Sequence, residues 1–121
     1  MTQTKVLILA FVVALLLATP VRAQDVTSGN YLIGSCQITL RVIDNPNITL
    51  DKYEAWRDGY CRGIIEGVGA ASPLVCSPQG VTFSQEYRIV TKYLQDHPER
   101  LNSHGAELVQ EALVQAFPCS K

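Results

Sequence analysis

The sequence predicts an all-α fold, a bundle of four helices or slightly more that forms one domain and is stapled by disulfides. Apolar residues recur at spacings of three and four along several segments, as they do on the buried face of a helix. Residues that cap helices and prolines that end them flank these segments. Four cysteines, an even number, all follow an N-terminal leader.

Residues 1–23 have the pattern of a secretory signal peptide. Lys5 precedes an apolar run at 6–18, and Pro20 and a small-residue ending at Ala23 follow it. The run is shorter than the roughly 20 residues of a spanning helix, so a membrane anchor is the less favoured alternative. Cleavage after residue 23 of the 121 would leave a domain of 98 residues, 24–121. A domain of this size has a small core and needs reinforcement.

The charge of the mature domain excludes several partners. Without Lys5 and Arg22 it has eight basic and eleven acidic residues, a formal charge of −3. The basic residues are scattered singly, with no run that could follow a phosphate backbone. We therefore expect no nucleic-acid partner, and no stable membrane anchor once the leader is cleaved.

The first expected helix is short and spans residues 28–36, with Ser28 as its cap. Residues 37–50 contain β-branched side chains and a cluster typical of turns, namely Asp44, Asn45, Pro46 and Asn47. We expect this second stretch to be a long loop.

The second expected helix, residues 50–71, has the clearest pattern. Its apolar residues recur at helical spacing and should line the core: Tyr53, Trp56, Tyr60, Ile64 and Val68. A second stripe consists of Gly59, Gly63 and Gly67, and each glycine inside a helix costs about 1 kcal/mol relative to alanine. Close approach of another backbone would compensate. That backbone belongs either to a helix of the same domain, which we favour, or to a partner chain.

The third expected helix begins at Thr82, where Gln85 stands at the spacing of a capping box. It should end at His97, because the residue before Pro98 avoids helical geometry. Its expected apolar stripe is Phe83, Tyr87, Val90 and Leu94.

The fourth expected helix covers residues 103–117, with a cap at Asn102 or Ser103 and an end before Pro118. Its expected inward residues are Leu108 or Val109, Ala112, Leu113 and Ala116. Leu101, in the short connection that precedes it, should tuck beneath the turn.

The connection between the last two helices gathers side chains that can bind a metal, move a proton or contact a partner: Asp96, His97, Glu99, Arg100, Asn102 and His104. We interpret it as the corner of a helical hairpin, because a metal site needs three or more converging ligands and these residues spread around two helix ends. We expect no metal, no cofactor and no catalytic residues here. A rigid polar tip is a candidate partner-binding surface. In the alternative it is only a solvated turn, and the loop at 41–50 or the second helix binds the partner.

The four cysteines are expected to form two disulfides. If the last two helices are antiparallel, Cys119 lies near Cys76, and Cys36 is left for Cys61. Four cysteines allow three connectivities, so the other pairings stay open. Zinc binding is disfavoured, because the sequence has no CxxC pair and no histidine at ligand spacing from a cysteine.

Two stretches carry a family resemblance, GYCRGIIEGV at 59–68 and PQGVTFSQEYRIVTKYLQDHPERLNSHGAELVQEALVQAFPC at 78–119. The shared pattern is a helix with a cysteine followed closely by a glycine, a turn rich in Cys and Pro, GVT opening a helix, YL..HPE.L at the corner and a closing AL..AFPC. In this order and spacing, over roughly residues 60–119, the chain resembles the Rap/Tai family of type VI secretion immunity proteins.

The resemblance implies a small exported helical protein of a Gram-negative periplasm. Such proteins bind peptidoglycan amidase effectors, block the active-site cleft, need no cofactor and commonly form homodimers. They are not enzymes. The alternative function is a periplasmic structural or chaperone-like helical protein without a toxin partner; an apolar-ligand carrier and a hydrolase are less favoured.

Overall fold

The structure is a computed structural model that describes residues 1–16 and 24–120. It contains the helices α1 (Thr2–Leu16), α2 (Gly29–Asp44), α3 (Lys52–Ala71), α4 (Phe83–Asp96) and α5 (Gly105–Ala116), and the 3₁₀ turn η1 (Pro98–Arg100). Apart from two isolated bridges, these described ranges contain no β-structure. The predicted all-α domain is confirmed.

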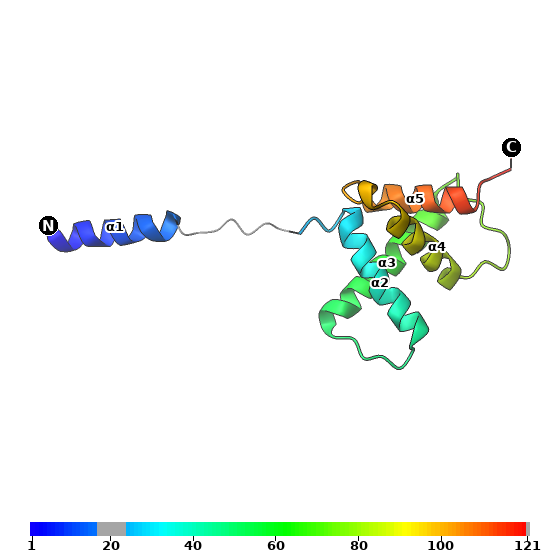
Figure 1. The fold of residues 1–121 in the computed structure, drawn as a ribbon, viewed down its shortest axis with the longest axis horizontal. Coiled ribbons are helices and arrows are strands. Elements are labelled where there is room, and N and C mark those ends of the chain that lie inside the picture. Colours follow the sequence, from blue (N-terminus) through cyan, green and yellow to red (C-terminus); the bar gives the residue numbers. More distant parts are fainter. Residues whose placement is uncertain (17–23, 121) are drawn as a thin grey trace.

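Helices α2 to α5 pack around one core (Figure 1). Helix α2 pairs with α3, α4 pairs with α5, and each pair contacts the other. The fully buried apolar residues come from all four helices and include Leu32, Ile65, Val90, Leu94, Leu108, Val109 and Leu113.

Helix α1 lies within the expected signal peptide. Its side chains Val6, Leu7 and Ile8 are 60 to 70% exposed. Among the described residues, no helix is both long enough and apolar enough to cross a membrane. The expected end of the leader, at Ala23, falls outside the described residues.

Helix α2 extends to Asp44, so the prediction of a long loop at 37–50 was wrong for its first eight residues. Ile38 and Thr39 are buried in the interface with the rest of the bundle. Their packing outweighs the weak preference of β-branched residues against helix. The predicted cap is confirmed, because the Ser28 hydroxyl accepts a hydrogen bond from the Tyr31 amide at 3.3 Å.

Helix α3 begins with a capping box of Asp51 and Glu54. Its fully buried residues are Cys61 and Ile65, whereas Tyr60, Ile64 and Val68 are half-buried. The expectation that Tyr53 and Trp56 line the core was wrong, since they are 51% and 66% exposed. The disulfide from Cys61 to Cys36 fixes the face that α3 turns toward α2, and the two aromatic side chains lie away from it.

The glycine stripe of α3 does not contact another helix of the domain. A Cβ atom built on Gly59, Gly63 or Gly67 would meet no described atom within 4 Å beyond its own helix and chain neighbours. The favoured explanation, close packing inside the domain, was therefore wrong, because this face of α3 points away from the core. Contact with a partner chain stays a prediction.

Helix α4 has the predicted capping box of Thr82 and Gln85, and it ends at Asp96 with His97 as its C-cap. Three of the four residues of its expected apolar stripe are buried, but Phe83, at the first position of the helix, is 60% exposed.

Helix α5 starts two residues later than predicted. His104, rather than Asn102 or Ser103, occupies the N-cap, and its side chain accepts no capping hydrogen bond. The expected inward residues are buried except Ala116, which is exposed at the end of the helix.

Two disulfides join the helices in the pairing that the sequence favoured. Cys36 and Cys61 connect α2 to α3, with Cα atoms 5.1 Å apart. Cys76 and Cys119 connect the loop after α3 to the segment after α5, with Cα atoms 4.9 Å apart. They close loops of 25 and 43 residues, which on chain-entropy grounds stabilises the domain by about 3.5 and 4 kcal/mol.

Candidate functional site

The corner between α4 and α5 is a compact turn with a definite local cause. Pro98 stops α4 and occupies the first position of η1, where its missing amide costs nothing. The chain then tightens into a single 3₁₀ turn, and Leu101 packs partly buried against the core. The predicted tight connection and the inward position of Leu101 are both confirmed.

Backbone hydrogen bonds fasten the corner to the start of α2. The Gly29 amide donates to the Ser103 carbonyl, and the Asn30 amide donates to the Leu101 carbonyl, both at 2.9 Å. The first amides of a helix have no partner within the helix. The corner supplies partners for two of them, so the turn is held by a second element in addition to its own helices.

Two glycines allow this close approach. A Cβ on Gly29 would lie 2.5 Å from Leu108 Cδ1 and 3.0 Å from the Leu101 carbonyl oxygen. A Cβ on Gly105 would lie 3.3 Å from the Thr27 carbonyl oxygen, which accepts the Gly105 amide at 2.7 Å. Sequence reasoning missed both glycines, because neither belongs to a regular spacing such as the stripe of α3.

Arg100 lies against α5 and pairs with Glu111 at its surface. Its guanidinium makes two hydrogen bonds of 2.8 Å to the Glu111 carboxylate, and the Tyr93 hydroxyl donates to the same carboxylate at 2.7 Å. These bonds from Arg100 and Tyr93 lower the pKa of Glu111. Burial, and then the bond to Glu111, raises the pKa of Tyr93. The contacts of Arg100 therefore hold the corner against α5.

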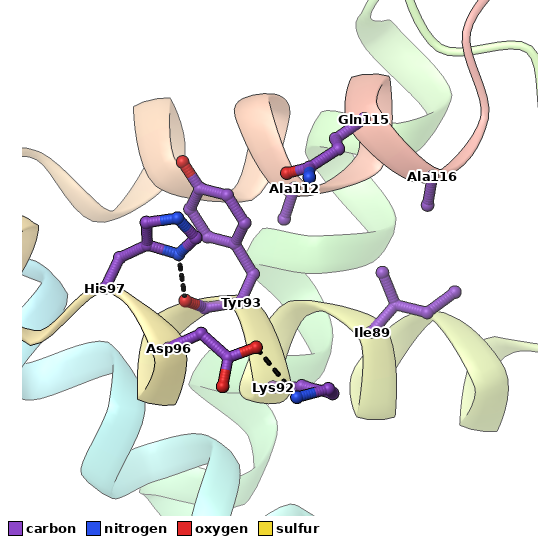
Figure 2. A pocket seen from close by; sticks show the side chains of 8 residues that line it. All are labelled: Ile89, Lys92, Tyr93, Asp96, His97, Ala112, Gln115 and Ala116. Carbon is purple, nitrogen blue, oxygen red and sulfur yellow. Dashed lines mark hydrogen bonds and ion pairs between the residues drawn. The ribbon is translucent and has the colours of Figure 1, made fainter.

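His97 and Asp96 are also held by their own helix (Figure 2). The His97 ring stacks on Tyr93 with centroids 4.2 Å apart, and its Nδ1 lies 2.8 Å from the Tyr93 carbonyl oxygen. Asp96 accepts a hydrogen bond of 2.8 Å from Lys92, one turn earlier.

The six predicted corner residues therefore divide into two groups. The first group is held by contacts within the chain. It contains Asp96, His97 and Arg100, and also Asn102, which accepts a side-chain hydrogen bond from Asn30 at 3.1 Å. Within the described part of the chain, the side chains of Glu99 and His104 make no hydrogen bond or ion pair, and both are exposed. These two are available to a partner without loss of an internal contact.

A groove of about 290 Å³ opens beside the corner, between α4 and α5. Figure 2 shows its floor of small and aliphatic side chains, with Tyr93 and His97 at one end and the Lys92–Asp96 pair on the rim. The lining residues are Ile89, Lys92, Tyr93, Asp96, His97, Ala112, Gln115 and Ala116. An apolar floor with a charged rim suits one inserted side chain of a protein partner.

The corner does not form a metal centre. Among residues 1–16 and 24–120, no group of three or more His, Cys, Asp or Glu side chains is placed to hold a metal ion. Asp96, His97 and Arg100 are bonded to neighbouring residues of the chain, and the side chains of Glu99 and His104 are exposed. The arrangement is suited to contact rather than to proton transfer.

A second exposed feature lies on α3. Tyr53 and Trp56 are exposed, and a shallow cavity of about 300 Å³ is lined by Ala55, Trp56, Gly59 and Tyr60. Exposed aromatic side chains of this kind are common at protein contacts. This surface corresponds to the second-helix alternative for partner binding.

Taken together, these observations describe a small, disulfide-stapled all-α domain with two exposed candidate contact surfaces. The chain belongs to the Rap1a immunity protein family, whose family model matches residues 28–119. The match covers helices α2 to α5 and all four cysteines, and it confirms the family resemblance of the sequence. No curated protein and no solved structure matches the chain.

Proposed function

We propose that this protein is a periplasmic immunity protein of type VI secretion that binds a peptidoglycan amidase effector and occludes its active site. The observation that carries the proposal is the family match over the whole disulfide-stapled domain. Membership of an immunity family gives the protein its role, the neutralisation of a toxin by binding. The amidase target and the periplasmic site are the further steps of the proposal.

Three features support action outside the cytoplasm. Residues 1–23 have the pattern of a signal peptide. The apolar side chains described in α1 are exposed rather than packed in the core. Both disulfides belong to an oxidising compartment. A periplasmic immunity protein would meet an effector where its peptidoglycan substrate lies.

We place the contact with the effector on the hairpin corner and the adjoining groove. An enzyme cleft is blocked best by a convex element that keeps its shape, since ordering a flexible loop on binding costs affinity. The corner is held by α4, α5 and the start of α2. Glu99 and His104 offer free polar groups at its tip, and the groove beside it can receive an effector side chain.

The proposal is tested with the mature protein, residues 24–121, and a small secreted peptidoglycan amidase, where an adjacent reading frame encodes one. We expect near-stoichiometric inhibition of peptidoglycan hydrolysis and a complex that is stable in gel filtration. A heat-unfolded sample is the control. An active amidase that this protein neither binds nor inhibits would reject the amidase target and favour a structural or chaperone-like role.

We further propose that the outer face of α3 pairs with a second copy of the chain. An antiparallel pairing centred on Gly63 would set Gly59 against the partner's Gly67 and Trp56 against the partner's Ala70, so a large side chain meets a small one. Lys52 would approach the end of the other α3, whose last turn has no basic residue. Sedimentation equilibrium tests this: Gly63→Leu should abolish a dimer, and a wild-type protein that is monomeric throughout would reject the pairing.

A further inference from the structure

The two disulfides lie in opposite environments. Cys36 and Cys61 are 0% exposed and belong to the core cluster between α2 and α3. Cys76 is exposed in the loop after α3, and Cys119 is only half-buried after the end of α5. Exposed disulfides exchange with external thiols, whereas buried ones react only after the protein opens.

We infer that Cys76–Cys119 is a thiol–disulfide exchange site, a place where a small thiol or a dithiol protein reacts with the folded domain. The inference is independent of the proposed toxin partner. It depends on the exposure of the bond, on the way its two segments are held, and on the contrast with Cys36–Cys61.

Few interactions hold the two segments together besides the disulfide. The Cys76 amide donates to the Phe117 carbonyl at 2.9 Å, and Val75 and Pro118 form an isolated bridge. The Cys119 sulfur lies 3.6 Å from the Pro73 carbonyl oxygen, at the exposed edge of the loop. Helix α5 has already ended at Ala116. Cys119 can therefore move away without unwinding a helix.

The chemistry balances with an external thiol as reductant. A thiolate attacks the Cys76 sulfur, the Cys76–Cys119 bond breaks, and the electron pair leaves on Cys119, which takes up a proton. The product is a mixed disulfide between the thiol and Cys76. A second thiol attacks the external sulfur of that mixed disulfide and releases Cys76 as a thiol. The two external thiols are oxidised to a disulfide, and their two electrons reduce Cys76–Cys119.

The direction of attack follows from exposure. Cys76 is the more exposed of the two residues, and its departing partner Cys119 lies on a segment that can withdraw. Reduction would remove the covalent link between the loop at 72–82 and the segment after α5, and would leave the non-covalent contacts between them. The Cys36–Cys61 bond would continue to join α2 to α3 inside the core.

The test uses the oxidised mature protein under native conditions. Reduced glutathione is added in steps, the reaction is quenched with acid, free thiols are alkylated, and the cysteine peptides are identified by mass spectrometry. We expect a glutathione adduct on Cys76 and free thiol on Cys119. The reduction should be at least about 100-fold faster than that of Cys36–Cys61, because the buried pair reacts only through opened states. Far-ultraviolet circular dichroism should show that the helices persist.

Two controls make the result decisive. Cys76→Ser with Cys119→Ser should remove the fast reaction, and in denaturant all four cysteines of the wild type should react alike. If both disulfides of the native protein are reduced at the same rate, or neither reacts before unfolding, the inference is overturned. A glutathione adduct found mainly on Cys119 would overturn the assignment of Cys76 as the attacked sulfur.

Discussion

Replacing Gly29 with alanine should destabilise the domain, although alanine is the better helix former. The new Cβ atom would lie 2.5 Å from Leu108 Cδ1 and 3.0 Å from the Leu101 carbonyl oxygen. Neither neighbour can yield freely, because Leu108 is 0% exposed and the Leu101 carbonyl accepts the Asn30 amide. Overpacking of this kind costs about 1 to 3 kcal/mol. For a domain of this size each kcal/mol lowers Tm by about 4 to 8 °C.

Gly63→Ala is the matched control, since both substitutions add one methyl group to a helical glycine. Position 63 is exposed, and no described atom beyond its own helix and chain neighbours would lie within 4 Å of the new Cβ atom. The alanine should stabilise the monomer by about 0.4 to 1 kcal/mol. Thermal and urea unfolding of the oxidised mature proteins, followed by circular dichroism at two protein concentrations, measures both effects. A Gly29→Ala variant at least as stable as the wild type would refute the reasoning from close approach.

Three further predictions can be checked on the same purified protein. Thiol titration in denaturant without reductant should find no free thiol, and two or more per chain would contradict the disulfide assignment. Glu99→Ala with His104→Ala should leave Tm nearly unchanged and weaken effector binding in calorimetry by about 2 kcal/mol or more. Unchanged affinity, equal to that of the exposed control Gln37→Ala with Gln95→Ala, would place the contact elsewhere. The pKa of Glu111 is lowered in the folded state, so its contribution to stability is present above its unfolded pKa and lost as pH falls through the folded pKa. Glu111→Gln should therefore flatten the loss of stability below about pH 4.5, and an unchanged acid limb would show that its bond to Arg100 adds nothing.

The helix signals that could be predicted from the sequence are those with a local cause. Ser28 and Thr82 cap helices through their own side chains, and Pro98 stops a helix by its own ring. The second half of α2 could not be predicted in this way. Its β-branched residues and the turn cluster after it resemble a loop, and only packing against other helices makes residues 37–44 helical.

The candidate site was predicted in outline but not in detail. The position of the corner follows from Pro98, which acts locally, whereas the predicted cap of α5 at Asn102 or Ser103 was wrong. The hydrogen bonds of Arg100 could not be predicted, because its partner Glu111 lies eleven positions further along the chain, in α5. The glycines that matter for packing, Gly29 and Gly105, carry no regular spacing, whereas the regular stripe of α3 is exposed. Spacing shows which residues share a face, but it does not show what covers that face.

The internal contacts of the corner bear directly on how it could inhibit an enzyme. Arg100 and Asn102 are already bonded within the chain, so binding need not order them. An exposed ion pair such as that of Arg100 adds little to stability, but it keeps the turn in one shape before the partner arrives. Preorganisation of this kind raises affinity by reducing the entropy lost on binding. In the complex that we propose, the free side chains Glu99 and His104 would then select the partner, on a scaffold whose shape is already set.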